Sequence, residues 1–103
     1  MYKNEVKNII EEVYPFIQAY YGKSKFNGEA PKVDYHHSIW ARITGVHNAE
    51  GDFYPAADFE RETNTIWIYY PEAVNEKWVI QTLIHEYTHY LQDGDEMKRL
   101  YDE

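Results

Sequence analysis

Residues 65–92, TIWIYYPEAVNEKWVIQTLIHEYTHYLQ, contain a strand pattern that is followed almost directly by a helix pattern. The first six residues are β-branched or aromatic on both faces, which predicts a central, buried strand. Asn75 is a good N-cap and Glu76 is favourable in a first turn, so a helix should begin here. We expect this helix to run to about Gln92 and to stop at Gly94.

A second helix is predicted near the N-terminus. Apolar residues recur at a helical period from Val6 to Tyr20 and should face one core. Pro15 interrupts this pattern, so we expect a kink or two short helices, with Gly22 as the stop. Residues 22–31 have the composition of a loop.

Two further segments have strand character. Residues 38–44 and 53–61 are separated by a turn at 48–52 and are expected to pair antiparallel. Pro55 cannot donate to a sheet ladder, which places the second segment at an edge. The prediction is one α+β domain over residues 1–103, with an N-terminal helix, a mainly antiparallel sheet of three or four strands, the helix of residues 75–92, and a short C-terminal helix or tail.

Composition excludes several classes of function. Ten basic and eighteen acidic residues give a net charge of −8, which opposes binding to nucleic acid or to an anionic membrane. There is no cysteine, so any bound metal must use histidine and carboxylate ligands. No stretch approaches the roughly twenty apolar residues of a membrane span, and the N-terminus lacks a signal-peptide core. We therefore expect a soluble, cytoplasmic protein.

The segment His85-Glu86-Tyr87-Thr88-His89 carries the strongest chemical signal. Residues four apart on a helix share a face, so His85 and His89 can direct two imidazoles at one Zn²⁺ ion. Glu86 projects about 100° around the helix, beside the place where a water activated by the metal would lie. A surface helix with two solvated histidines is the alternative interpretation.

The rest of this helix is amphipathic in a way that supports the metal interpretation. The apolar side chains gather on one broad side, and His85 and His89 point to nearly the opposite side. One face should pack on the sheet while the other forms the floor of a cleft. The apolar residues are Val79, Ile80, Leu83, Ile84, Tyr87, Tyr90 and Leu91.

The strand TIWIYY, the short connection through Pro71 and the helix segment TLIHEYTHYLQ together resemble the zincin metallopeptidases. In size the chain is similar to the minigluzincins, compact zincins in which a C-terminal segment can occupy the cleft and hold the enzyme latent. The resemblance implies a Zn²⁺ cofactor on His85 and His89, with Glu86 as general base. It also implies that an edge strand binds peptide substrate in extended form. The residues of that strand would be Phe53, Tyr54, Ala56 and Ala57.

Several carboxylates are candidates for a third zinc ligand. Catalytic zinc sites usually have three protein ligands, and only fourteen residues follow His89. Glu103 and Glu96 are the candidates, and a solvated acid near the chain end is the alternative for each. A metzincin arrangement would use Asp95, but Gln92 stands where that family has the glycine that its sharp turn needs.

The other histidines and two tyrosines are weaker candidates for the site. His36 and His37 are adjacent in a predicted strand, so their side chains should face opposite ways and cannot chelate together. His47 borders a turn. Tyr90 and Tyr101 are candidate hydroxyl donors to an oxyanion; packing is the alternative role for each, in a chain with eleven tyrosines.

The functional hypothesis is a zinc metallopeptidase that acts on a peptide or protein substrate. One alternative is a latent or degenerate zincin-type module that binds zinc or a peptide without turnover. The ending KRLYDE resembles an interrupted helix, so the natural third ligand could also follow residue 103. A third alternative is an acidic interaction or inhibitor protein in which the HExxH pattern is accidental.

Overall fold

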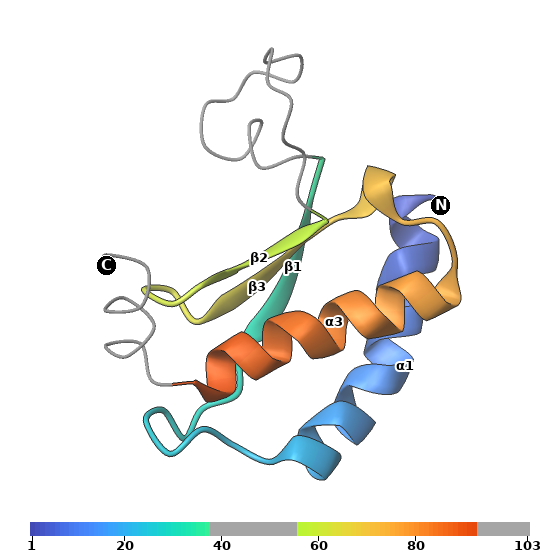
Figure 1. The fold of residues 1–103 in the computed structure, drawn as a ribbon. Coiled ribbons are helices and arrows are strands. Elements are labelled where there is room, and N and C mark those ends of the chain that lie inside the picture. Colours follow the sequence, from blue (N-terminus) through green and yellow to red (C-terminus); the bar gives the residue numbers. More distant parts are fainter. Residues whose placement is uncertain (38–55, 93–103) are drawn as a thin grey trace.

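The structure is a computed structural model that describes residues 1–37 and 56–92. The fold is α+β, as predicted: two helices lie against a three-stranded sheet (Figure 1). Helix α3 packs against α1, β2 and β3, so it forms the centre of the molecule. The elements in chain order are α1 (Lys3–Tyr21), β1 (Lys32–His36), β2 (Ala57–Glu60), β3 (Thr65–Tyr69), the 3₁₀ turn η1 (Tyr70–Glu72) and α3 (Glu76–Leu91).

The sheet is mixed, with the strand order β1-β3-β2. Strand β3 is central, as its two apolar faces predicted, and four of its five residues are buried. Strand β2 pairs with it antiparallel and lies at an edge of the described sheet. Strand β1 pairs with β3 in parallel, with Val33 opposite Ile66. A parallel pair needs a long crossover, and residues 37–64 supply it.

The strand predicted at residues 38–44, its antiparallel pairing with 53–61 and the effect of Pro55 lie outside the described residues. Residues 32–36, KVDYH, form β1, which ends at His36, one of the two histidines expected in a strand. Val33 and Tyr35 alternate with polar residues and pack against the core. The parallel ladder therefore depends on a strand of five residues with one face towards the core.

Helix α1 is continuous over 19 residues and contains Pro15, so of the two expected outcomes, a kink or two short helices, the second is wrong. Pro15 lies on the exposed side of the helix, while Ile10 and Ile17 on either side of it are buried. Their packing offsets the one backbone hydrogen bond that a proline removes. Gly22 ends the helix as predicted, with φ of 74° and its N–H donating to the carbonyl of Gln18.

Tyrosines of both helices fix the loop that follows α1. Three hydroxyls donate to backbone carbonyls of residues 22–31, and the Tyr90 hydroxyl also accepts from the Ser24 N–H at 3.1 Å. Each ring thus buries apolar area while its polar end satisfies a backbone group. The donor–acceptor pairs are Tyr14 with Pro31, Tyr87 with Gly22, and Tyr90 with Asn27.

Neither α1 nor α3 has the combination of length and hydrophobicity that crossing a membrane requires.

Replacing Tyr90 by Phe should destabilise the fold by about 1–3 kcal/mol, because it leaves a buried N–H and a carbonyl without their partner. The Tyr90 side chain is 1% exposed and makes both hydrogen bonds to the loop. Urea unfolding of the variant measures the loss. Tyr20→Phe is the matched control, because Tyr20 is 82% exposed, and it should change stability little. Equal stabilities for the two variants would contradict this role of the Tyr90 hydroxyl.

Candidate metal centre

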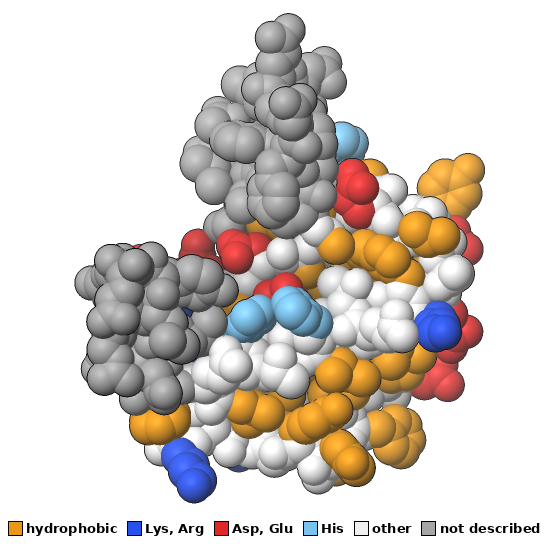
Figure 2. All heavy atoms as spheres, in the orientation of Figure 1, with side chains coloured by type: hydrophobic (Ala, Val, Ile, Leu, Met, Phe, Trp, Pro, Cys, Tyr) orange, Lys and Arg blue, Asp and Glu red, His pale blue; other side chains and the backbone are white. Residues whose placement is uncertain are grey.

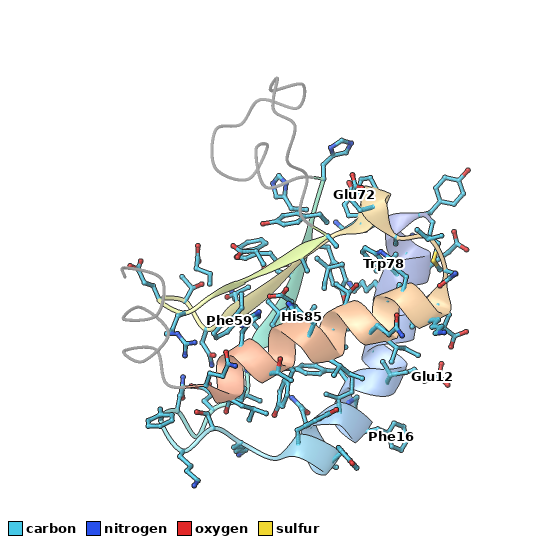
Figure 3. All side chains as sticks on the ribbon, viewed as in Figure 1. Glu12, Phe16, Phe59, Glu72, Trp78 and His85 are labelled. Carbon is cyan, nitrogen blue, oxygen red and sulfur yellow. The ribbon has the colours of Figure 1, made fainter. Side chains whose placement is uncertain are left out.

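The orientation of α3 is fixed by contacts at its N-terminal end and along its buried side. At its start, the Asn75 side chain accepts a hydrogen bond from the Trp78 N–H at 2.8 Å, which confirms the predicted N-cap. Tyr87 and Tyr90 lie on the buried side of the helix. His85 is therefore exposed and leaves α3 on the side nearer β2 (Figure 3).

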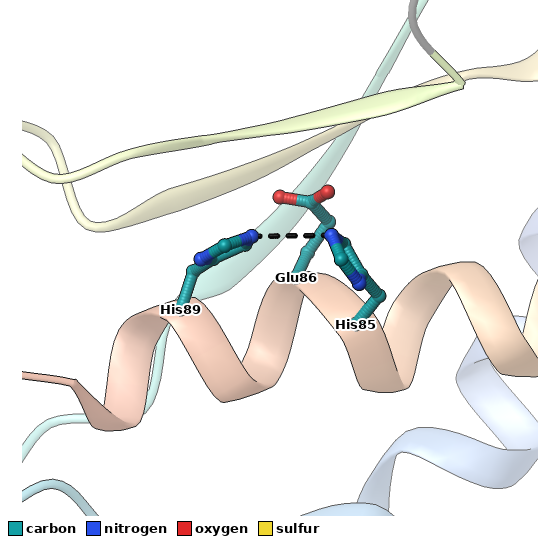
Figure 4. Close-up of side chains that lie close together, drawn as sticks. All are labelled: His85, Glu86 and His89. Carbon is teal, nitrogen blue, oxygen red and sulfur yellow. Dashed lines mark hydrogen bonds between the residues drawn. The ribbon is translucent and has the colours of Figure 1, made fainter. Parts of the chain in front are cut away.

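The two histidines of α3 converge on one point. His85 Nε2 and His89 Nε2 are 3.1 Å apart (Figure 4). Two imidazoles bound to the same tetrahedral zinc, at a Zn–N distance of about 2.05 Å, would have their nitrogens roughly 3.3 Å apart. The observed spacing is close to this value without any rearrangement. On the surface, two histidine side chains lie next to each other with an acidic group behind them (Figure 2).

Glu86 joins this pair. One ligand atom each of His85, Glu86 and His89 lies within 4.8 Å of the others, and no other such group of three occurs within residues 1–37 and 56–92. The Glu86 carboxylate rises between the two imidazoles on the side facing the sheet (Figure 4). It is 7% exposed. The helical offset from His85 thus places the carboxylate next to the pair and under β2 and β3.

Burial controls the proton affinity of Glu86. It raises the pKa of this carboxyl group from 4.5 to about 7. His85 opposes this shift, and the negative charge of Asp58 on β2 reinforces it. A carboxyl group with a pKa near neutrality can both accept and release a proton, which is the property of a general base.

Two residues that were not predicted as functional support the end of this helix. Gln92 Oε1 lies 3.3 Å from His89 Nδ1. Arg61 donates to the carbonyl of His89 at 2.8 Å and to that of Gln92 at 3.2 Å. The spacing of three residues between His89 and Gln92 could have indicated the first contact. The contact of Arg61 depends on the tertiary fold and has no local signal.

The remaining predicted residues divide into two sets. His36 contacts the ring of Trp67 and His37 that of Tyr70, so the two histidines lie apart, as expected for neighbours at a strand end. The hydroxyl of Tyr90 is occupied by the loop of residues 22–31. Ala57 begins β2, beside α3. Phe53, Tyr54, His47, Asp95, Glu96, Tyr101 and Glu103 lie outside the described residues, so the third ligand stays a prediction.

Comparison with protein families, curated proteins and solved structures gives no match for this chain.

The metal-free protein should lose stability through Glu86 as the pH rises from about 4.5 to 7. In this window the folded state keeps a proton that the unfolded chain has released, because burial raises the pKa of the carboxyl group to about 7. Glu86→Gln has no such proton. The variant should therefore gain on the order of 2 kcal/mol relative to the wild-type protein between pH 4.5 and 8.

Urea unfolding in the presence of EDTA, repeated across this pH range, measures the difference. The two proteins should be similar below about pH 4, where the carboxyl group is mostly neutral in both states. A difference in stability that does not change with pH would contradict the raised pKa.

Proposed function

We propose that this chain is a zinc-dependent hydrolase of the zincin type that cleaves peptide bonds. The observation that carries the proposal is the 3.1 Å separation of His85 Nε2 and His89 Nε2, with the Glu86 carboxylate beside them. Two solvated histidines could instead direct these nitrogens at water, whereas a shared metal ion requires both to point at one position. The position of all three on one helix also makes the site rigid, which favours catalysis.

The donor atoms favour zinc. Two imidazole nitrogens and a carboxylate, in a chain without cysteine, are of the type found in hydrolytic zinc sites. Under this proposal His85 and His89 hold the metal, and Glu103 or Glu96 supplies the third ligand. A bound Zn²⁺ ion would supply Lewis acidity, polarising a carbonyl group and lowering the pKa of water.

Glu86 is assigned the proton transfers. Its carboxylate would accept a proton from the water that attacks the peptide carbonyl carbon, and it would return this proton to the nitrogen of the leaving amine. The nearby cation would lower the pKa of Glu86 from its metal-free value of about 7 and favour the basic form. Burial of the carboxylate under the sheet fixes its direction relative to the histidines.

Strand β2 is the proposed substrate-binding element. It lies at an edge of the described sheet and packs against α3, the helix that carries the site. A peptide or protein substrate in extended form could pair with such an edge through backbone hydrogen bonds. Residues 53–57 would then bind the substrate on the side of the sheet nearest to His85.

A second candidate is a module that binds zinc without turnover. Within the described parts of the chain the ligand group consists of His85, Glu86 and His89 alone. If Glu86 itself coordinated the metal, it would not be free to move a proton. Both candidate proteins would bind zinc, but only the first would hydrolyse peptide bonds.

Zinc binding should depend on both histidines. The wild-type protein should bind one equivalent of Zn²⁺, and His85→Ala or His89→Ala should weaken binding at least 100-fold, because each removes one of few ligands. Competition with a chromophoric chelator measures the affinity. His37→Ala is the control, since His37 lies outside the ligand group, and it should bind as the wild type does. Equal affinities for all four proteins would contradict the site.

Hydrolysis should depend on Glu86 in a different way. Glu86→Gln should retain zinc but lower the rate of cleavage of an unfolded protein by about 10²–10⁴-fold, because the amide cannot accept the proton. Gel and mass-spectrometric analysis of the digestion follows the rate. Undiminished proteolysis by this variant would contradict the mechanism. Zinc binding without turnover by the wild-type protein would favour the second candidate.

A further inference from the structure

His89 has a hydrogen-bond partner that determines which of its nitrogens is free. Gln92 Oε1 lies 3.3 Å from His89 Nδ1, and an amide oxygen can only accept. A hydrogen bond to this oxygen requires the hydrogen of the neutral imidazole to be on Nδ1. This arrangement leaves the lone pair on Nε2, the atom that faces His85.

The contact between the two imidazoles also bears on the position of the hydrogen on His85. Its Nε2 lies 3.1 Å from that of His89, and one of these two nitrogens must donate to the other. Since His89 Nε2 has the lone pair, His85 donates from Nε2. With both hydrogen bonds formed, the pair would be asymmetric in the metal-free protein: His89 would be in the tautomer that binds a metal, and His85 would not.

The backbone around Gln92 is held from the neighbouring hairpin. Arg61, directly after β2, donates to the carbonyls of His89 and Gln92, at 2.8 and 3.2 Å. Its guanidinium lies 5.2 Å from the centre of the Phe59 ring. These contacts fix the last turn of α3 against the sheet, and with it the distance between the Gln92 side chain and the imidazole.

The geometry points to Gln92 as a positioning residue that holds His89 as its Nδ1–H tautomer, with Nε2 directed at the metal position. His85 then moves its hydrogen from Nε2 to Nδ1 when it becomes a ligand. An acceptor behind a ligating histidine raises the basicity of the imidazole and fixes its direction. The effect on metal affinity rests on the proposed function, whereas the tautomer of His89 in the metal-free protein does not.

The tautomers can be measured directly in the metal-free protein. Long-range ¹H–¹⁵N spectra with EDTA, at a pH where both imidazoles are neutral, should show His89 with hydrogen on Nδ1 and His85 with hydrogen on Nε2. Gln92→Leu should shift His89 towards the Nε2–H tautomer, because no acceptor remains. Gln92→Glu keeps an acceptor oxygen and should restore the Nδ1–H form.

Gln81→Leu is the matched control. Gln81 is exposed on the same helix and lies eleven residues earlier, about three turns or 16 Å along the axis on a similar face. It tests the effect of replacing an exposed glutamine by leucine without touching His89. The His89 signals of this variant should match those of the wild-type protein.

Zinc titration of the same four proteins separates this inference from the proposed function. Gln92→Leu should bind Zn²⁺ about 10–100-fold more weakly than the wild type, and Gln92→Glu at least as tightly as the wild type. An unchanged His89 tautomer in Gln92→Leu would overturn the inference, even if every protein binds zinc. A tautomer shift in Gln92→Leu would support it, and if the wild type then bound no zinc, only the proposed metal function would fail.

Discussion

The division of α3 into two faces is the constraint on which the rest of the structure depends. Tyr87 and Tyr90 are buried, and their hydroxyls hold the loop that follows α1. This anchoring fixes the rotation of the helix about its axis. With the rotation fixed, His85 and His89 must leave the helix on the other side, one turn apart, with their Nε2 atoms 3.1 Å from each other. The geometry of the candidate site thus follows from the packing behind it.

The sheet supplies the second half of the site. The Glu86 carboxylate lies on the side of α3 that faces the sheet, and its burial raises its pKa while Asp58 of β2 reinforces the shift. The hairpin of β2 and β3 carries Arg61, which binds the carbonyls at the end of α3. Packing, electrostatics and hydrogen bonding therefore act on one short segment of helix. A buried carboxylate is costly in a stable fold, and such costs are typical of functional sites.

Much of this arrangement could be predicted from local sequence. The two apolar faces of residues 65–69 indicated the central strand, and Asn75 with the pattern after it indicated the helix and its histidine face. The parallel pairing of β1 could not be predicted, because the alternation of KVDYH does not identify its partner, which is distant in the chain. Continuity of α1 through Pro15 depends on tertiary packing at Ile10 and Ile17. The support from Arg61 likewise arises only when the hairpin meets the helix.

The most direct test of the central claim is a crystal structure of the zinc-loaded protein with anomalous data collected at the zinc edge. We predict an anomalous peak about 2.0–2.1 Å from both His85 Nε2 and His89 Nε2, with the Glu86 carboxylate outside the coordination sphere. The same map would identify the third ligand. A peak away from this pair, or none there at saturating zinc, would contradict the account.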